Sequence, residues 1–326
     1  MATTNPKLGV HTRLTLWGPP EVTERTLTMV REMGARWVVE YFPWLYLQPR
    51  PDSYDWAGSD RIVDAALVQG LTPIVRLDGV PEWARPPGTT WKYITPEHYE
   101  TYGRFLEEFA RRYRGRVDHI IVWNEPNLRG EWGDRPPDPA AYTELLRVAH
   151  AHIKRGNPDS VVLLAGLAPN TEPPGSAAAM DDLAYLRGLY DAGASFFFDA
   201  LAVHTYGTVY PPDDPADPAR VNFARAELVA RLAAERGDGD KPIFITEGGW
   251  NDNPRWVAGV RPPERIRHTV RALDKARDEW PWCAAVAFWQ FRTDTLTRSY
   301  SDNWTFVTPD FVPKPIYDEV RGHVRP

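Results

Sequence analysis

Two glutamates follow short apolar segments that lie far apart along the chain. Glu125 stands in the run Trp-Asn-Glu-Pro-Asn after Ile-Ile-Val, and Glu247 stands in the run Thr-Glu-Gly-Gly-Trp after Ile-Phe-Ile. Two carboxylates that face one cavity can divide their roles, because one can be held protonated while the other stays ionised. The hydrolysis of a glycosidic bond needs such a pair. The alternative is two unrelated surface acids at the ends of strands, although burying either one unpaired would be costly.

The segments before these glutamates belong to a longer series. Short runs rich in Val, Ile and Leu recur along the chain, and most are apolar on both faces, as parallel strands covered by helices are. The expected strands are Leu8–Arg13, Ala35–Phe42, Leu71–Leu77, His119–Trp123, Val161–Gly166, Phe198–His204, Ile243–Thr246 and Ala284–Trp289.

Longer amphipathic stretches lie between these runs, and several begin with Pro or an acidic residue, which suits helix termini. The expected helices are Glu21–Met33, Ser59–Gln69, Pro96–Tyr113, Pro139–Lys154, Asp181–Tyr190, Ala219–Glu235, Pro263–Glu279 and Pro315–His323. Strands that alternate with helices predict a parallel α/β fold. Repeats of this size and number, without a Gly-rich loop after the first strand, favour a closed (β/α)8 TIM barrel over a dinucleotide-binding sheet. We expect one catalytic domain over residues 1–326.

In such a barrel the loops that follow the strands share one rim, where active sites are built. The long irregular stretches that follow expected strands are Glu82–Thr95, Arg129–Pro139, Asn170–Ala179, Thr208–Asp217 and Asp294–Val312. Glu125 and Glu247 both lie at the C-terminal ends of expected strands. The barrel therefore predicts that the two carboxylates meet at this rim.

The two glutamate motifs together resemble those of the retaining glycoside hydrolases of clan A, which share a (β/α)8 barrel. The similarity covers essentially the whole chain. It includes three further motifs, Tyr54-Asp55-Trp56, His204-Thr205-Tyr206-Gly207 and Phe288-Trp289-Gln290. The Asn-Glu-Pro-Asn form with a downstream aromatic residue, Trp132, is most similar to family 39 and its relatives, with family 5 next.

The resemblance implies that Glu125 is the general acid/base and Glu247 the nucleophile. A hydrogen bond from a tyrosine would keep the nucleophile ionised. The sugar-binding residues that it implies are Asn124 (a hydrogen bond to the 2-hydroxyl), His204 and Tyr206 (the floor of the site, with Tyr206 as donor to Glu247) and Trp289 (stacking under the sugar in subsite −1).

The second expected strand departs from the clan pattern, because it lacks the arginine that many members carry near the nucleophile. It reads Trp-Val-Val-Glu-Tyr-Phe-Pro-Trp from Trp37 to Trp44. We expect Arg76, at the end of the third strand, or Arg13, at the end of the first, to supply the positive charge instead.

Other residues near the expected rim allow both a functional and a structural interpretation. His11, near the end of the first strand, can point to the sugar or serve the core. Asp78 beside Arg76 is either a structural ion pair or a substrate contact. The tryptophans that touch sugar or pack a loop are Trp44, Trp83, Trp132 and Trp250. The acids outside any catalytic motif are Glu40, Glu82 and Glu131.

Composition limits the possible partners. The chain has 326 residues, of which 43% are hydrophobic and 25% charged, as is ordinary for a globular protein. The net charge of −6, without a long basic run, argues against binding to nucleic acid or to an anionic membrane. The single cysteine, Cys283, excludes an internal disulfide, and no motif with metal-ligand spacing occurs. We therefore expect no metal and no other cofactor.

No apolar run reaches the length of a membrane span, and the first residues lack the apolar core of a signal peptide. We therefore expect a cytoplasmic protein, or a secreted one if a leader has been removed. A monomer that acts on a carbohydrate is the expected form.

The sequence predicts a retaining β-glycoside hydrolase that cleaves O-glycosidic bonds of a polysaccharide or oligosaccharide by double displacement. Rim loops that carry tryptophans, without an evident accessory β-domain, favour an open groove and endo action. The alternatives are an exo-β-glycosidase of the xylosidase or glucosidase type, a transglycosylase on the same barrel, and a carbohydrate-binding barrel without catalysis. Residue types alone do not rank xylan, β-glucan, mannan or a bacterial exopolysaccharide as the substrate.

Overall fold

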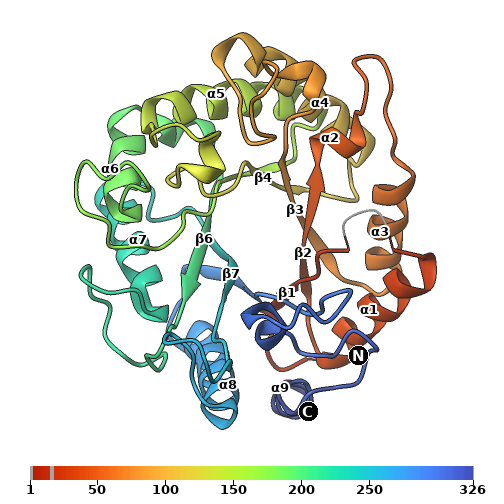
Figure 1. Cartoon of the computed structure of the whole chain (residues 1–326), viewed down its shortest axis with the longest axis vertical. Helices are drawn as coiled ribbons and strands as arrows, with labels where there is room; N and C mark the ends of the chain where they lie inside the picture. The colour runs from red at the N-terminus through yellow and green to blue at the C-terminus, as the bar shows by residue number, and fades with distance from the viewer. Residues whose placement is uncertain (1–2, 15–17, 326) are drawn as a thin grey trace.

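The computed structural model describes residues 3–14 and 18–325 of the chain. Its strands are parallel and form a closed barrel in which each strand pairs with its sequence neighbours and β8 pairs with β1 (Figure 1). The strands are β1 (Leu8–His11), β2 (Trp37–Pro43), β3 (Thr72–Asp78), β4 (His119–Val122), β5 (Val161–Leu164), β6 (Ala200–Tyr206), β7 (Ile243–Gly249) and β8 (Cys283–Phe288). The predicted (β/α)8 barrel is confirmed.

Helices surround the barrel and cover the outer face of its strands (Figure 1). They are α1 (Pro20–Met33), α2 (Trp44–Leu47), α3 (Ala57–Val68), α4 (Pro96–Arg112), α5 (Pro139–Gly156), α6 (Asp182–Asp191), α7 (Ala226–Glu235), α8 (Pro262–Asp278) and α9 (Pro315–Val324). Apart from α7 and the short, unexpected α2, each begins and ends close to its predicted bounds. None of the helices in the described ranges has both the length and the apolar character of a transmembrane span.

The helix expected over Ala219–Glu235 is shorter than predicted, because α7 begins only at Ala226. A 3-10 turn over Phe223–Arg225 precedes it. The amide of Asn222 donates a hydrogen bond of 2.6 Å to the carboxylate of Asp214. Local side-chain hydrogen bonds of this kind compete with helix formation, and here they hold the segment before α7 in an irregular conformation.

Each strand presents one row of side chains to the barrel interior and the other row to the helices. In β3, Ile74 belongs to the inner layer, whereas Val75 and Leu77 belong to the outer one. The inner layer consists of Val39, Ile74, Ile121, Leu163, Ala200, Ala202, Phe244, Ala285 and Ala287. Apolar groups on both faces explain why the strands read as continuous hydrophobic runs.

Candidate active site

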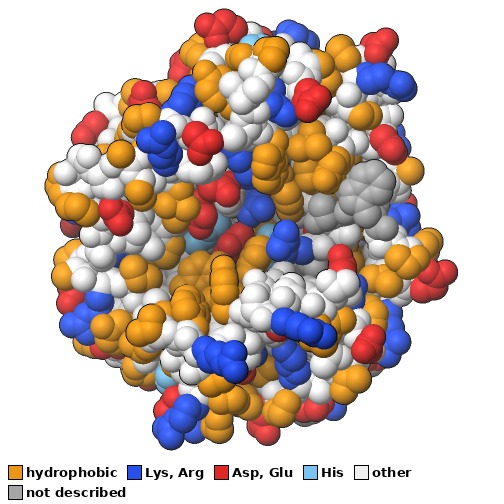
Figure 2. Space-filling view, in the orientation of Figure 1, with side chains coloured by type: hydrophobic (Ala, Val, Ile, Leu, Met, Phe, Trp, Pro, Cys, Tyr) orange, Lys and Arg blue, Asp and Glu red, His pale blue; other side chains and the backbone are white. Residues whose placement is uncertain are grey.

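The inward-facing row of the strands changes from apolar to polar at the C-terminal end of the barrel. Ile74 of the inner layer is followed two residues later by Arg76, and Ala202 is followed by His204. Because strand side chains alternate, the inward-facing row that fills the barrel with apolar side chains also places polar side chains at its mouth. Figure 2 shows acidic, basic and histidine side chains gathered in the hollow at the centre of the ring.

Glu247 lies within β7, and only 7% of the residue is exposed. Its Oε1 accepts a hydrogen bond of 2.8 Å from Nη1 of Arg76, and its Oε2 accepts one of 2.8 Å from the hydroxyl of Tyr206. Burial alone would raise the pKa of Glu247, but the nearby His204 and Arg76 outweigh burial and lower the pKa to about 2. This carboxylate is therefore ionised at neutral pH, as an attacking group must be.

Glu125 follows β4 at a backbone position with a φ of 40°, a left-handed conformation that is uncommon outside glycine. Its N–H donates to the carbonyl of Gly166 at 3.0 Å, and its Oε1 lies 2.8 Å from Nδ1 of His204. Burial lowers the pKa of His204, but Glu247 and the hydrogen bond to Glu125 outweigh burial, so the pKa is raised overall. His204 thus connects the two glutamates electrostatically.

Glu125, His204 and Glu247 each bring one donor atom within 4.8 Å of the others. The two predicted glutamates therefore face the same small space at the barrel mouth. Three such atoms can also ligate a metal ion. Within the protein, however, Glu125 and His204 already share a hydrogen bond, and Arg76 already donates to Glu247.

Arg76 supplies the positive charge that β2 lacks. Besides the glutamate of β7, its Nη1 donates to Oδ1 of Asn124 at 2.8 Å, and its Nε lies 3.3 Å from Oδ2 of the fully buried Asp78. Arg13, the other arginine expected to serve, lies over Trp289 instead, with its Cζ 5.3 Å from the ring centroid. Asp78 therefore pairs with the arginine below the surface of the site.

Lys92 and Glu131 join the site although neither stands in a recognisable motif. Nζ of Lys92 lies 2.7 Å from Oδ1 of Asp78 and 2.7 Å from Oε2 of Glu131. Nδ2 of Asn124 donates to the same Glu131 oxygen at 3.2 Å, so this amide is held on both sides, by Arg76 and by Glu131. The only sequence signal is that Glu131 closely follows the Asn-Glu-Pro-Asn motif.

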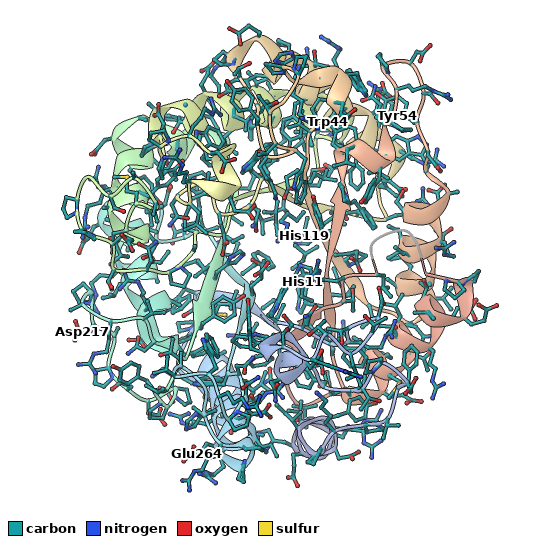
Figure 3. The ribbon with its side chains drawn as sticks, viewed as in Figure 1. His11, Trp44, Tyr54, His119, Asp217 and Glu264 are labelled. Carbon is teal, nitrogen blue, oxygen red and sulfur yellow. The ribbon has the colours of Figure 1, made fainter. Side chains whose placement is uncertain are left out.

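His11 lies near the centre of the ring (Figure 3). It packs edge-on against Trp289 with the ring centroids 4.7 Å apart, and its Nε2 lies 3.9 Å from Oε1 of Glu247. Burial lowers the pKa of His11 well below its usual value despite this carboxylate. Neither ring nitrogen has a hydrogen-bond partner among the described residues. His11 is fully buried, so this neutral imidazole lies against Glu247 beneath the surface of the site.

Two tryptophans expected to contact sugar lie in the core instead. Trp132 is 1% exposed and packs edge-on against Trp123. Trp250 is 2% exposed, and its Nε1 donates to the carbonyl of Tyr210 at 2.7 Å. Trp44 is also buried and lies away from the centre of the ring (Figure 3). These rings fill the space between elements, so none of them presents a face to the barrel mouth.

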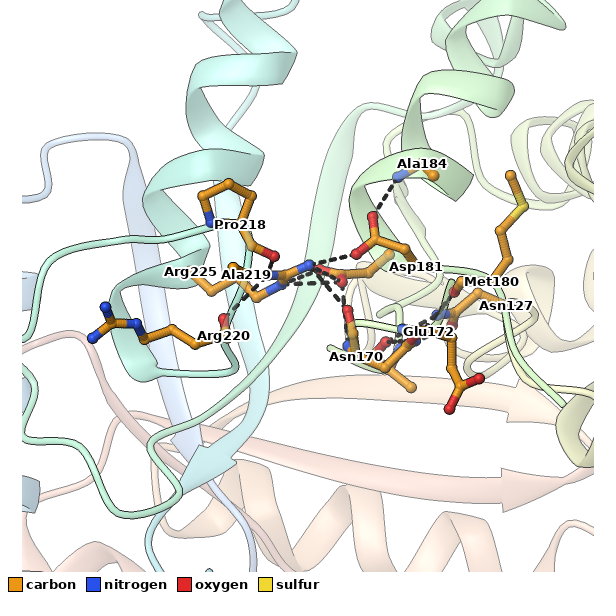
Figure 4. Close-up of polar contacts among 12 residues, drawn as sticks. Asn127, Asn170, Glu172, Met180, Asp181, Ala184, Pro218, Ala219, Arg220 and Arg225 are labelled. Atoms are coloured by element: carbon orange, nitrogen blue, oxygen red, sulfur yellow. Dashed lines mark hydrogen bonds and ion pairs between the residues drawn. The ribbon is translucent and has the colours of Figure 1, made fainter. Parts of the chain in front are cut away.

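Hydrogen bonds join the loops that carry the site (Figure 4). Asn127, two residues after Glu125, donates to the carbonyl of Met180 at 3.0 Å. Arg225 donates to the carboxylate of Asp182 and to the carbonyl of Asn170. The loop after β4 is therefore fastened to the loop after β5, which is fastened in turn to the segment before α7.

A family model described as beta-galactosidase, of glycoside hydrolase family 42, matches residues 16–123 of the chain. The matched stretch contains β2, β3 and β4 and ends immediately before Asn124. The search of curated proteins found no match.

Solved structures resemble the chain over nearly its whole length. A family 39 glycoside hydrolase from the gut symbiont Bacteroides cellulosilyticus WH2 is 23% identical with a TM-score of 0.78, and the match covers 98% of this chain and 64% of that one. A family 5 protein from Streptomyces cattleya, solved in complex with GlcNAc, is 18% identical with a TM-score of 0.72, covering 99% and 80%. An exo-beta-1,4-mannosidase from Opitutaceae bacterium strain TAV5 is 16% identical with a TM-score of 0.64, covering 98% and 59%.

These comparisons confirm the predicted resemblance to glycoside hydrolases of clan A. The predicted enzyme class, a glycoside hydrolase, is the class of the matching family and of the similar structures. The chain spans less than two thirds of the family 39 protein, since the match covers 64% of that chain. At these identities, the solved structures support the barrel fold alone.

Proposed function

We propose that the chain is a retaining β-glycoside hydrolase in which Glu247 is the nucleophile and Glu125 is the general acid/base. The observation that carries this proposal is the separation of at most 4.8 Å between a carboxylate oxygen of each residue. Retaining enzymes hold their carboxyl groups about 5–5.5 Å apart, whereas inverting enzymes leave about 6.5–9.5 Å for a water molecule. The short separation favours retention.

The first step forms a covalent intermediate. The ionised oxygen of Glu247 attacks the anomeric carbon while Glu125 gives its proton to the departing glycosidic oxygen. In the second step Glu125 takes a proton from water, the water oxygen bonds to the anomeric carbon, and Glu247 leaves as a carboxylate. Arg76 and Tyr206 stabilise that carboxylate in the free enzyme through their 2.8 Å hydrogen bonds.

In this proposal Asn124 binds the sugar that is held between the glutamates. Asn124 is fixed by Arg76 and Glu131, so its amide meets the 2-hydroxyl with little loss of side-chain freedom. His11 is fully buried beside Glu247, and neither of its ring nitrogens has a hydrogen-bond partner among the described residues. Trp289 offers an aromatic face beside it.

The first test is the stereochemistry of the product. Aryl β-glycosides of glucose, galactose, xylose and mannose identify the sugar that is cleaved, and proton NMR during hydrolysis identifies the first anomer released. We expect the β-anomer to form first, because two displacements restore the starting configuration. Initial release of the α-anomer would contradict the mechanism.

The second test replaces the acid/base. Glu125→Ala should lower kcat by about 10²–10⁴-fold on poor leaving groups, the usual contribution of acid–base catalysis. Azide should restore turnover of a 2,4-dinitrophenyl glycoside and yield the β-glycosyl azide, because that leaving group needs no proton and azide replaces the activated water. Glu144→Ala, an exposed acid on α5, is the matched control. Activity of Glu125→Ala equal to that of the control would refute the assignment.

For the substrate we propose a β-linked polysaccharide or oligosaccharide cleaved internally. Exo action is the second candidate, because one structure with the same fold is named an exo-beta-1,4-mannosidase. Chromatographic sizing of early products separates the two modes, since internal cleavage shortens the polymer before monosaccharide accumulates. Product analysis at high acceptor sugar concentration measures transglycosylation by the same intermediate.

A further inference from the structure

A cavity of about 1060 Å³ opens at the ends of β1, β2 and β8. Its lining includes Arg13, Tyr41, Trp91 and Gln290. Tyr41 also packs against Arg76, whose Cζ lies 4.5 Å from the tyrosine ring centroid, so the cavity adjoins the site of the two glutamates. A volume of this size suits a bound ligand of several hundred Å³, the usual range for specific pockets being about 300–1,000 Å³.

The order of the strands indicates on which side of the scissile bond the cavity lies. In a closed ring ordered β1 to β8, strand β8 stands across from β4, and β1 and β2 stand across from β5 and β6. The general acid of the proposed function, Glu125, follows β4 and must lie beside the leaving oxygen. The leaving group therefore extends toward the β4 side, and the retained part of the glycan extends toward the cavity.

Two exposed aromatic rings and one buried amide equip the cavity for a sugar. Trp91 is 44% exposed and Tyr46 is 37% exposed, although both are large apolar side chains. Gln290 is only 3% exposed, lines the cavity, and its side chain makes no hydrogen bond with any residue in the described ranges. Its amide can therefore bond a ligand hydroxyl in the cavity, and aromatic faces suit the apolar faces of sugars.

The charges that line the cavity favour an anion. Its charged lining residues are Arg13, Arg292 and Asp294. Arg292 pairs with Asp294 at 2.8 Å. Arg13 is exposed, lies over Trp289, and forms no ion pair with the residues that the structure describes. One positive charge is thus left over at the cavity of a chain whose net charge is −6.

We propose that this cavity binds a second, acidic sugar on the non-reducing side of the scissile bond, with Arg13 pairing to its anionic group and Gln290 hydrogen-bonding its hydroxyls. This proposal rests on the proposed glycosidase function and names its substrate class. A uronic acid carboxylate and a sulfate ester both supply the required charge. Pairing of an arginine with either group is charge-assisted and directional.

Four chromogenic probes test the proposal. The first is the 4-nitrophenyl β-glycoside of the sugar that is cleaved fastest. The other three carry on its 4-hydroxyl a β-linked glucose, glucuronic acid or glucose 6-sulfate. We expect kcat/KM to rise from the first probe to the glucose probe, and to rise about tenfold or more again for a charged probe, as for a hydrogen bond to a charged group. The faster charged probe identifies the anionic group.

Substitutions connect this preference to the cavity. Arg13→Asn tolerates the positive φ of 48° at this position and removes the charge. It should lower kcat/KM about tenfold more for the charged probes than for the glucose probe, and Arg13→Lys should restore part of the preference. Gln290→Glu should also disfavour the charged probes by repulsion. Arg147→Ala, an exposed arginine on α5, is the control and should change none of the ratios.

The probes separate the absence of an acidic subsite from the absence of glycosidase activity. Release of nitrophenol from all four probes at equal kcat/KM, or a preference untouched by Arg13→Asn, overturns the acidic subsite and leaves the glycosidase intact. If no probe is cleaved, the proposed function fails. Calorimetric titration with the disaccharide glucuronosyl-β-1,4-glucose then tests the cavity alone: binding that Arg13→Asn abolishes supports it, and the lack of binding refutes it.

Discussion

Arg76 and Arg225 are both buried arginines bound to carboxylates, yet their surroundings differ. Each nitrogen of Arg225 donates to a carboxylate or to a backbone carbonyl (Figure 4). Beside Arg76 and Glu247, by contrast, both ring nitrogens of His11 are buried without a hydrogen-bond partner among the described residues. Buried polar groups are nearly always satisfied in folded proteins. The guanidinium of Arg225 is therefore fully paired within the fold, whereas the cluster around Arg76 keeps unused hydrogen-bonding capacity at the imidazole of His11.

The carboxylates bound to these two arginines also differ, because their pKa values shift in opposite directions. Burial raises the pKa of Asp182 even though Arg225 donates to it. Burial acts on Glu247 too, but His204 and Arg76 lower its pKa to about 2. The charge of Asp182 is thus tolerated at a cost, as in many buried ion pairs, whereas several groups converge to keep Glu247 ionised.

The largest effect should follow from removing the negative charge of Glu247. Glu247→Gln keeps the side-chain shape but cannot form the covalent intermediate. We expect kcat to fall by about 10⁴-fold or more, the scale of losing a nucleophile, while circular dichroism shows an unchanged fold. Steady-state kinetics on the fastest aryl glycoside measures the loss. Near-normal turnover on every active substrate would show that the pairing of the two glutamates has another purpose.

Arg225→Met should instead act on stability. It leaves Asp182 buried without its partner, so the free energy of unfolding should fall by about 3–5 kcal/mol. Urea denaturation followed by tryptophan fluorescence measures this change. In the folded enzyme kcat should stay close to that of the unchanged protein, because Arg225 contacts neither glutamate of the site.

The double variant Arg225→Met, Asp182→Leu is the matched control for that prediction. Replacing both members of a buried ion pair by apolar groups is often neutral or stabilising. We therefore expect most of the lost stability to return. If the double variant is no more stable than Arg225→Met alone, the cluster stabilises the loops by its backbone hydrogen bonds rather than by pairing charges.

Arg76→Met should combine a moderate loss of activity with a change in pH dependence. We expect kcat/KM to fall about 100-fold, as for the loss of one donor to reacting charge. Without Arg76, burial is less opposed, so the pKa of Glu247 should rise. The attacking carboxylate must be ionised, so the acidic limb of the pH–rate profile should move to higher pH.

The low pKa of Glu247 also determines how this residue contributes to the pH dependence of stability. The pKa of Glu247 in the folded protein, about 2, lies below the usual value. Its ionised form therefore adds stability above the unfolded pKa, and this stability is lost as the pH falls through the folded pKa. In Arg76→Met the folded-state pKa of Glu247 should lie closer to its unfolded value. Protonation of Glu247 at low pH should therefore cost this variant less stability than it costs the unchanged protein. An acidic limb that does not move in Arg76→Met would mean that His204, His11 and Tyr206 keep Glu247 ionised without Arg76.

The sequence predicts the elements and the two glutamates because those signals are local. Apolar runs mark the strands, and the motifs around Glu125 and Glu247 stand directly after or within them. It also offers two arginines for the missing charge, and only the closed barrel distinguishes Arg76 from Arg13. Lys92 comes from the loop after β3, and its partners lie on other segments. No spacing along the chain encodes such a contact.

For the tryptophans a sequence signal is present, but it does not distinguish a ring that faces sugar from one that faces the core. A ring on a predicted rim segment has the same sequence signal whether it faces sugar or the core. Trp132 is 1% exposed, while the adjacent Glu131 has a side chain that is 28% exposed and reaches the site. The turn over Gly130–Trp132 decides which of the two neighbours points inward. Orientation within a loop depends on tertiary packing, which periodicity does not record.

Glu131→Gln should give the smallest effect and measure how far the catalytic cluster extends. Glu131 holds the amide of Asn124, but Arg76 holds the same residue from its other side. Glu131→Gln keeps an oxygen that accepts from Asn124 but makes this hydrogen bond neutral, which costs about 1 kcal/mol, so KM should rise by a few-fold to about tenfold while kcat changes little. Glu144→Gln on α5 is the control. A loss of kcat as large as that of Arg76→Met would place Glu131 among the groups that stabilise the transition state. The catalytic charges would then include a residue of the rim loop after β4, not only residues of the strands.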